Sequence, residues 1–282
     1  MIIENIFRLV LVFFIFISGC IPMQSPERFK KYTSMDEAFR NRADVRFLSL
    51  DGSNLTQVPV FDIAKFPNLC KLSLRNNRLE SVDAAIGTLK QLVFLDLSQC
   101  GVRSLPVEIS NLMNLKQLYL AGNELQVLPP SIGQCSSLSY INLDRNNLIS
   151  LPSEIRKLTG LKWLRVNNNQ MGFLPSEIGN LINLERLYLE SNKLKDLPSD
   201  LSKLTRLTDL NIRKNEFEIF PAPILQLQNL SRLDLDGNRI ATVPEDIKKM
   251  TKLRTLCLQN NKLSESEKDR ITRLLPDCRI VF

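Results

Sequence analysis

The sequence contains no histidine, the side chain that most often acts as a base in catalytic triads and most often binds zinc. It also contains no Gly-x-Ser-x-Gly motif and no glycine-rich phosphate-binding loop. A serine or cysteine nucleophile needs a base to activate it, and the sequence indicates no residue for that role. These absences argue against an enzyme, so we expect no catalytic residue and no small-molecule substrate.

Cysteine is scarce and scattered. The chain has 6 cysteines, and no two of them form a Cys-x-x-Cys pair, the spacing typical of zinc and redox sites. Apart from Cys20, they are interpreted as small apolar or surface thiols, at Cys70, Cys100, Cys135, Cys257 and Cys278. We therefore expect no metal site and no cofactor.

One repeated unit fills most of the chain. The segment Leu184–Arg206 begins L-x-x-L-x-L-x-x-N-x-L, and copies of it recur at intervals of 23 residues, once of 24. The ten copies begin at Val45, Leu69, Leu92, Leu115, Leu138, Leu161, Leu184, Leu207, Leu230 and Leu253. A fixed period of this length with this pattern indicates a solenoid, in which stacking of the units makes a continuous core.

The spacing within the unit predicts its local structure. Leu187 and Leu189 alternate with polar residues, so this segment is expected to be a short strand with one face in the core. Asn192 follows, where its side-chain amide can satisfy backbone groups that the turn leaves open. Equivalent asparagines in other units are expected to form a buried ladder. Pro198 on the return leg favours a turn or a short helix over a second sheet.

These residues resemble the leucine-rich-repeat family over Val45–Leu263, in its regular 23-residue Leu-Pro-x-x-Ile form. The resemblance implies an α/β solenoid, with a parallel β-sheet on the concave face and short helices or 3-10 turns on the convex face. It also implies a recognition surface without catalysis. Animal extracellular members typically have cysteine-rich caps, and none is present in this sequence.

Residues 1–19 have the pattern of a signal peptide. Arg8 precedes the apolar run Leu9–Ile17, which is too short to span a bilayer. The following Ile17-Ser18-Gly19-Cys20 resembles the lipobox of bacterial lipoproteins, which implies that Cys20 carries the lipid. The alternatives are a non-cleaved membrane anchor and an ordinary signal peptide. With the repeats, the chain resembles bacterial leucine-rich-repeat lipoproteins, so we expect a lipid-anchored protein of the bacterial envelope, at the outer membrane or cell surface more than the inner membrane.

Caps are expected at both ends of the repeats. Residues 20–33 are interpreted as a lipidated tether, residues 34–44 as an N-terminal capping helix, residues 45–263 as the ten repeats and residues 264–282 as a C-terminal cap. Ser34 with Glu37, and Ser264 with Glu267, have the spacing of capping boxes. The segment Arg279–Phe282 is predicted to add a last strand, with Ile280 and Phe282 pointing inward.

The concave face is the expected partner surface, formed by the third and fifth residues of each unit. The only tryptophan and three of the 4 tyrosines fall in these two columns. Tryptophan, tyrosine and arginine are enriched at binding hot spots. We predict that the partner contacts Phe94, Tyr119, Tyr140, Arg145, Trp163, Arg165, Arg186 and Tyr188. The alternative is that aromatic side chains merely cover the sheet, as their β propensity favours.

The charge pattern bears on the class of partner. The net charge is +7, but charges of opposite sign alternate on the strand face, as at Asp144–Arg145 and Glu185–Arg186. This is typical of a solvated face rather than of a track for phosphates, so we expect no nucleic acid. The expected partner is a protein, and the family resemblance adds adhesion or host contact. Two alternatives stay open: an intracellular or periplasmic scaffold of the Ras-group type, and a structural envelope protein without a specific ligand.

Overall fold

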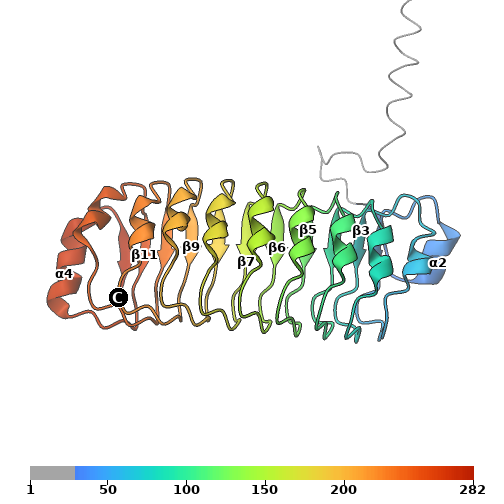
Figure 1. Ribbon diagram of the computed structural model, residues 1–282, viewed down its shortest axis with the longest axis horizontal. Helices are drawn as coiled ribbons and strands as arrows, with labels where there is room; N and C mark the ends of the chain where they lie inside the picture. Colours follow the sequence, from blue (N-terminus) through green and yellow to red (C-terminus); the bar gives the residue numbers. More distant parts are fainter. Residues whose placement is uncertain (1–28) are drawn as a thin grey trace, which may run out of the picture.

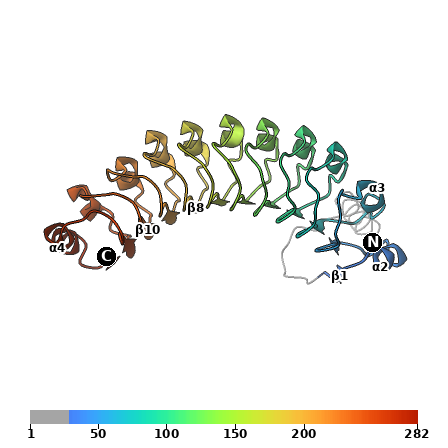
Figure 2. The same ribbon diagram turned by 90° about the horizontal axis from the view of Figure 1, so that it is seen from below.

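The computed structural model describes residues 29–282, which form a curved solenoid. The strands line its inner, concave side and the helices its outer, convex side (Figures 1 and 2). The predicted leucine-rich-repeat solenoid fold is thereby confirmed. The predicted signal peptide and Cys20 lie outside the described residues. Within them, no helix has the length and apolar character needed to cross a bilayer.

The described chain contains one sheet of 12 strands, in which each strand pairs in parallel with the next one along the sequence. The central residue of each repeat strand is a leucine or isoleucine that is fully buried, as at Leu187. The strands are β1 (Lys31–Tyr32), β2 (Phe47–Ser49), β3 (Lys71–Ser73), β4 (Phe94–Asp96), β5 (Gln117–Tyr119), β6 (Tyr140–Asn142), β7 (Trp163–Arg165), β8 (Arg186–Tyr188), β9 (Asp209–Asn211), β10 (Arg232–Asp234), β11 (Thr255–Cys257) and β12 (Arg279–Val281).

Short helices form the convex side, as the prolines of the return legs predict. A proline precedes every 3-10 helix of the described chain except the first, where Asp83 accepts a hydrogen bond from the Ala85 N–H. The 3-10 helices are η1 (Ala84–Thr88), η2 (Val107–Asn111), η3 (Pro130–Gln134), η4 (Ser153–Lys157), η5 (Ser176–Asn180), η6 (Ser199–Lys203), η7 (Ala222–Gln226) and η8 (Glu245–Lys249). The α-helices are α2 (Met35–Arg40), α3 (Val60–Ile63) and α4 (Glu265–Leu274).

The buried asparagine ladder is present. Asn192 Nδ2 donates to the carbonyls of Leu189 at 3.0 Å and Val166 at 2.9 Å, and its Oδ1 accepts from the Met171 N–H at 3.1 Å. Each asparagine thus connects its own turn to the preceding repeat. The same three contacts recur at Asn77, Asn123, Asn146, Asn169, Asn215, Asn238 and Asn261.

Cys100 takes the place of asparagine in one repeat, and the structure explains why it can. Its Sγ donates to the Leu74 carbonyl at 3.1 Å, which is one of the asparagine contacts. Its side chain supplies no amide oxygen, and the Leu79 N–H instead donates to the Cys100 backbone carbonyl at 2.9 Å. Burial raises the pKa of the Cys100 thiol, so the thiol stays protonated and remains a donor.

The N-terminal cap contains a strand that the sequence did not predict. Lys31 and Tyr32 form β1, which pairs with β2, whereas the interpretation of residues 20–33 as a tether placed no strand there. Ser34 caps α2 by accepting from the Glu37 N–H at 3.2 Å, as predicted. The Glu37 carboxylate does not complete a capping box, because it pairs with Lys30 Nζ at 3.0 Å.

The C-terminal cap shows a similar departure. Ser264 caps α4, but the Glu267 carboxylate accepts from the Val243 N–H at 2.8 Å and from Arg270 Nη2 at 2.6 Å. Glu267 therefore connects the cap to the last repeats instead of closing a capping box. The predicted last strand is present as β12, and Ile280 packs against the core. The inward placement of Phe282 was wrong: it lies beyond the strand and is 37% exposed.

The Glu267 contacts predict an acid-sensitive cap. The hydrogen bonds from Arg270 and the Val243 N–H lower the pKa of the Glu267 carboxyl. A lowered folded-state pKa gives stability that is present above the unfolded-state value, about 4.3, and is lost as pH falls through the folded-state value. We expect Glu267→Gln to lower the Tm at pH 7, and the difference from the wild type to shrink below about pH 4.

Thermal melts of the full chain across this pH range, followed by circular dichroism, test the Glu267 prediction. The matched control is Glu265→Gln, because the Glu265 side chain is 87% exposed and, among residues 29–282, pairs only with Lys268 on the same helix. An exposed ion pair contributes little, so we expect this control to leave the Tm nearly unchanged. A Glu267→Gln penalty that stays the same at both ends of the pH range would contradict the role of this carboxylate.

Candidate functional site

The concave face carries the predicted binding residues because of the repeat register. The first and last residues of each three-residue strand point away from the buried central leucine, since successive side chains of a strand alternate between its faces. Register pairing sets corresponding residues of neighbouring repeats side by side, as at Tyr140, Trp163 and Arg186. Adjacent strands lie about 4.8 Å apart, so aromatic side chains in these columns are within reach of one another.

Five aromatic side chains form a continuous row across the first six repeats, and we call it the aromatic row. It consists of Phe47, Phe94, Tyr119, Tyr140 and Trp163. Its successive ring centroids are separated by 6.4, 5.2, 4.8 and 5.8 Å, with interplanar angles between 33° and 66°. These distances and tilted arrangements are favourable for aromatic pairs. All five side chains stay partly exposed.

A cation covers each end of the aromatic row. Arg186 lies over the Trp163 ring, with its guanidinium carbon 4.1 Å from the ring centroid, and Lys31 Nζ lies 5.5 Å from the Phe47 centroid. The register sets Arg186 beside Asp209, yet among residues 29–282 it has no carboxylate partner within ion-pair distance. Its hydrogen-bond donors are therefore available to a ligand.

Arg165 and Tyr188 lie beside the aromatic row and are held by carboxylates. Arg165 donates to Asp144 Oδ2 through Nε at 2.8 Å and Nη2 at 2.6 Å, while the Tyr188 hydroxyl donates to Asp209 Oδ2 at 3.0 Å. Arg165 also lies over the Tyr188 ring, 5.5 Å from its centroid. Burial, followed by the nearby Asp209 charge, raises the pKa of Tyr188, so its hydroxyl stays protonated. These contacts fix both side chains before any partner binds.

Arg145 is the predicted site residue that the structure does not bring into this cluster. It follows β6 in the turn, where the eighth residue of every repeat has a positive φ, and its own φ is 58°. Its side chain is exposed, and no contact joins it to the other seven predicted residues in the described chain. Arg145 is close to the β6 residues in sequence, but the turn after the strand takes it away from the surface that they form.

The sequence interpretation left out two residues that extend the aromatic row. Phe47 was in the third column but lay outside the chosen repeats, and Lys31 lies in a strand that was not predicted. The column position was a sufficient signal for Phe47. Nothing in the repeat pattern indicated Lys31, because β1 precedes the first repeat.

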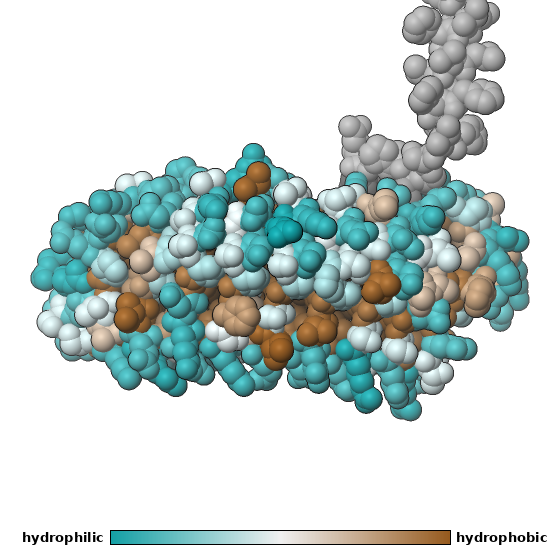
Figure 3. Space-filling view, in the orientation of Figure 1, coloured by the Kyte–Doolittle hydropathy of each residue, from teal (hydrophilic) through white to brown (hydrophobic). Residues whose placement is uncertain are grey.

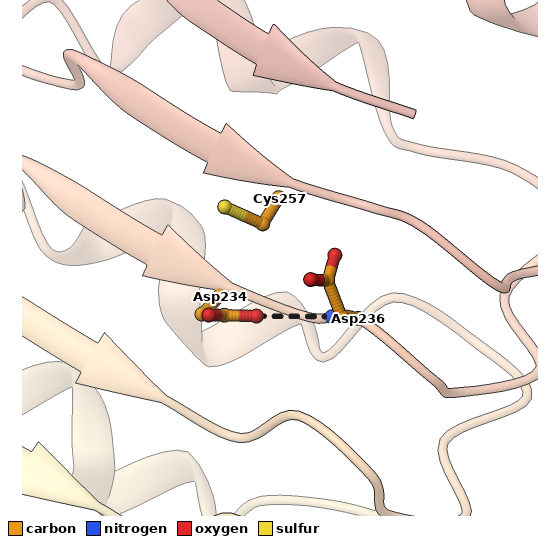
Figure 4. Close-up of side chains that lie close together, drawn as sticks. All are labelled: Asp234, Asp236 and Cys257. Atoms are coloured by element: carbon orange, nitrogen blue, oxygen red, sulfur yellow. Dashed lines mark hydrogen bonds between the residues drawn. The ribbon is translucent and has the colours of Figure 1, made fainter.

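A second cluster lies further along the same face. It consists of Asp234, Asp236 and Cys257 (Figure 4). One carboxylate oxygen of each aspartate and the sulfur of the cysteine lie within 4.8 Å of one another. Burial, the leading cause, raises the pKa of both the Asp236 carboxyl and the Cys257 thiol. Within the described residues, this is the one group with the side-chain types and spacing of a metal site.

The convex face differs from the concave one. Figure 3 shows it covered mostly by hydrophilic side chains, with hydrophobic ones in a broken band. Several apolar residues are exposed in the return legs and the segments that lead to the next strand, among them Val127, Phe173 and Ile182. Exposed apolar residues that do not form a large continuous patch are ordinary at protein surfaces and need no partner.

The fold and this surface define a repeat solenoid with one open sheet face. The sequence profile described as "Leucine-rich repeat region" matches residues 84–161 and 147–277, and the profile "Leucine rich repeat" matches residues 44–102. The chain belongs to the leucine-rich-repeat family. This family's fold generally serves protein interaction without catalysis. A comparison with curated proteins gives no match.

Three solved structures illustrate the likeness. A leucine-rich-repeat protein of Leptospira interrogans is 27% identical, with 90% of this chain and 100% of that chain covered and a TM-score of 0.55. The ectodomain of the Arabidopsis thaliana receptor kinase GASSHO1/SCHENGEN3 is 32% identical over 73% of this chain and 26% of that chain (TM-score 0.64). An internalin of Listeria monocytogenes, at 21% identity, covers 85% of this chain and 74% of its own, with a TM-score of 0.64.

Proposed function

We propose that this chain is a non-catalytic recognition protein that binds a protein partner through the aromatic row of its concave face. The observation that carries the proposal is the continuity of the aromatic row, from Phe47 to Trp163, and its end at Arg186, which no carboxylate neutralises within the described chain. Aromatic and arginine side chains are the usual hot spots of protein interfaces.

The arrangement favours a partner segment that runs along the aromatic row and ends in a carboxylate-bearing residue. Apolar or aromatic side chains of such a segment would pack against Tyr140 and Trp163, and its carboxylate would accept hydrogen bonds from Arg186. Arginine presents its donors in a planar fork that matches a carboxylate. The structure of GASSHO1/SCHENGEN3 contains CASPARIAN STRIP INTEGRITY FACTOR 2 as its bound partner, which supports a protein ligand on a fold of this kind.

The prediction for this surface concerns Trp163 and Arg186. We expect Trp163→Ala and Arg186→Ala each to weaken binding of the partner by about tenfold or more, because each change removes a hot-spot contact. Neither side chain is part of the buried core, so we expect the melt to stay nearly unchanged. The measurement is calorimetric titration of the isolated partner into the full chain.

The choice of variants matters for this test. Arg156→Ala is the matched control, since Arg156 is an exposed arginine of η4 on the convex side and its loss should leave both binding and melt unchanged. Arg165→Ala is unsuitable, because it would leave the Asp144 carboxylate, whose side chain is 11% exposed, without its cation. Unaltered affinity in both Trp163→Ala and Arg186→Ala would remove the concave-face proposal.

We also propose that Cys20 carries a lipid that anchors the chain to a bacterial membrane. The lipobox-like sequence Ile17-Ser18-Gly19-Cys20 motivates this, and the likeness to a leucine-rich-repeat protein of a bacterium supports it. Metabolic labelling with a radioactive fatty acid tests the proposal. We expect incorporation into the full chain and its loss in Cys20→Ala, while equal labelling of both would contradict lipidation at Cys20.

The localisation that goes with this anchor is the bacterial envelope, with the repeats at the outer membrane or the cell surface. Protease treatment of intact cells, followed by immunoblotting for the repeats and compared with lysed cells, tests the exposure. Loss of the signal on intact cells supports display to an external partner and a role in adhesion or host contact. Protection until lysis favours the alternative of a periplasmic or intracellular scaffold.

A further inference from the structure

The repeat register builds one cluster that the recognition surface does not use. Asp234 ends β10 and Cys257 ends β11, and these two residues are register partners in the sheet. Asp236 follows Asp234 by two residues, in the turn after β10. Figure 4 shows the three side chains on the same side of the two strands, with the Asp236 carboxylate extending toward Cys257. Because Cys257 lies one repeat beyond Asp234, only the stacked fold makes them neighbours.

Asp234 and Cys257 are buried, at 4% and 8% residue exposure, while Asp236, at 8% residue exposure, has a partly exposed position in the cluster. Each carboxylate has one oxygen engaged by the backbone: Asp234 Oδ1 accepts from the Asp236 N–H at 3.2 Å, and Asp236 Oδ1 accepts from the Gln259 N–H at 2.7 Å. The Cys257 thiol, which comes from the other strand, has no hydrogen-bond partner among residues 29–282 although it lies between these groups. A buried free cysteine needs no partner by itself, but its sulfur can bind a metal ion as a thiolate.

In the part of the chain that the structure describes, one ion pair reaches this cluster: Arg232 Nη2 lies 3.6 Å from Asp234 Oδ2, and the Arg232 side chain is 52% exposed. Arg213 and Arg279 add positive charge nearby without pairing with the cluster. Within the described residues, Asp236 has no ion pair. Two buried carboxylates close together are unfavourable unless a cation or protons neutralise them.

An equivalent position elsewhere in the solenoid shows what is missing here. Asp144 occupies the same place in its repeat as Asp236, and the fifth residue of the next repeat, Arg165, neutralises it at 2.6 Å. The residue in the place of Arg165 is Cys257. Asp144 therefore has a guanidinium beside it, whereas Asp236 has the Cys257 thiol and the Asp234 carboxylate beside it.

We propose that Asp234, Asp236 and Cys257 bind a divalent transition metal, with Zn²⁺ as the best match. A thiolate with carboxylate oxygens suits Zn²⁺, which binds sulfur at about 2.3 Å and carboxylate oxygen at about 2.0–2.2 Å, often with water in the fourth position. Such bond lengths place tetrahedral ligand atoms about 3.5 Å apart. The side chains, now within 4.8 Å of one another, need only small rotations to close on the ion.

The site occupies the place that Arg165 fills beside Asp144, so the metal serves as the missing cation on the concave face. The repeat pattern did not indicate this site, because Asp-x-Asp followed by a cysteine one repeat later is not a recognised metal spacing. The cluster shares no residue with the aromatic row or with the proposed lipid anchor at Cys20.

The experiment titrates the full chain, purified in detergent without chelator, with Zn²⁺ by calorimetry and with Co²⁺ by absorption spectroscopy. We expect a single Zn²⁺ per chain and, with Co²⁺, the near-ultraviolet charge-transfer band of a cobalt thiolate. Cys257→Ser should abolish this band. Both Cys257→Ser and Asp236→Asn should lower the Zn²⁺ affinity by at least about 100-fold, because each removes a direct ligand and the loss of an outer-shell partner alone costs up to about 100-fold.

The matched control is Cys278→Ser, which removes a thiol near the end of the same sheet that lies outside the cluster. We expect it to keep both the cobalt band and the Zn²⁺ affinity. Circular dichroism of each metal-free variant shows whether it is folded, and Asp236→Asn, which preserves the side-chain shape, stands in if Cys257→Ser unfolds. Absence of Zn²⁺ binding, or a cobalt thiolate band that survives in Cys257→Ser, would overturn the proposal.

Discussion

We expect replacement of Leu187 with alanine to lower the free energy of unfolding by about 2–5 kcal/mol. Leu187 is the central residue of β8 and is fully buried within the core that runs the length of the solenoid. Truncation removes apolar surface from the core and leaves a cavity against the repeats on either side. Strands on both sides hold the backbone of β8 through the parallel sheet, so the site cannot collapse to fill the cavity.

Urea unfolding of the full chain, followed by circular dichroism, measures the Leu187→Ala effect. Lys193→Ala in the same repeat is the control, because Lys193 is exposed and should change the stability by less than about 0.5 kcal/mol. If Leu187→Ala unfolds at the same urea concentration as the wild type, the assignment of this residue to the core is wrong.

The second large effect is expected from the asparagine ladder. Asn146 is 5% exposed, and its amide donates to the Leu120 and Leu143 carbonyls at 2.9 and 3.0 Å and accepts from the Leu125 N–H at 3.1 Å. Alanine would leave these backbone groups buried without partners. At about 1–3 kcal/mol for a buried group left unsatisfied, Asn146→Ala should cost roughly 3 kcal/mol.

The adjacent residue gives a matched control for the ladder. Asn147 is exposed, and among the described contacts its side chain makes no hydrogen bond, so Asn147→Ala should change stability little. Both variants are compared by the same urea titration. If Asn146→Ala and Asn147→Ala lower the free energy of unfolding equally, the buried hydrogen bonds of Asn146 contribute nothing to stability.

The regular part of the fold could be predicted from the sequence because the repeat encodes it locally. The alternation at Leu187 and Leu189 set the inward face of the strand, Asn192 set the turn, and Pro198 set the start of the convex helix. Repetition then fixed the register, since each unit needs its neighbours to bury its leucines. Both end caps were also placed by the spacing of Ser34 and Ser264.

The departures lie where a side chain has a partner that the local sequence pattern does not indicate. Glu37 and Glu267 have the spacing of capping boxes, but each carboxylate has a stronger charge-assisted partner. Glu37 pairs with Lys30, and Glu267 pairs with Arg270 and also accepts from the Val243 N–H. The strand β1 has no repeat signature, because it only continues the sheet edge. Phe282 follows the last strand residue, so alternation along the strand did not determine its direction.

The candidate site was predictable in position and not in contacts. Column position placed Tyr140, Trp163 and Arg186 on one face, but it did not reveal that Arg186 stacks on Trp163 while Arg165 is neutralised by Asp144. That difference separates a side chain available to a partner from one that the fold already uses. The role of these residues in binding stays a prediction.

The most direct test of the central claim is site-specific photo-crosslinking of the full chain in its own cells. A photoreactive amino acid is placed at Trp163 on the concave face and, as a matched control, at Arg156 on the convex face. A recognition surface on the aromatic row predicts a discrete crosslinked polypeptide from position 163 and none from position 156. Equal crosslinking from both faces, or crosslinking from the convex position alone, would contradict it.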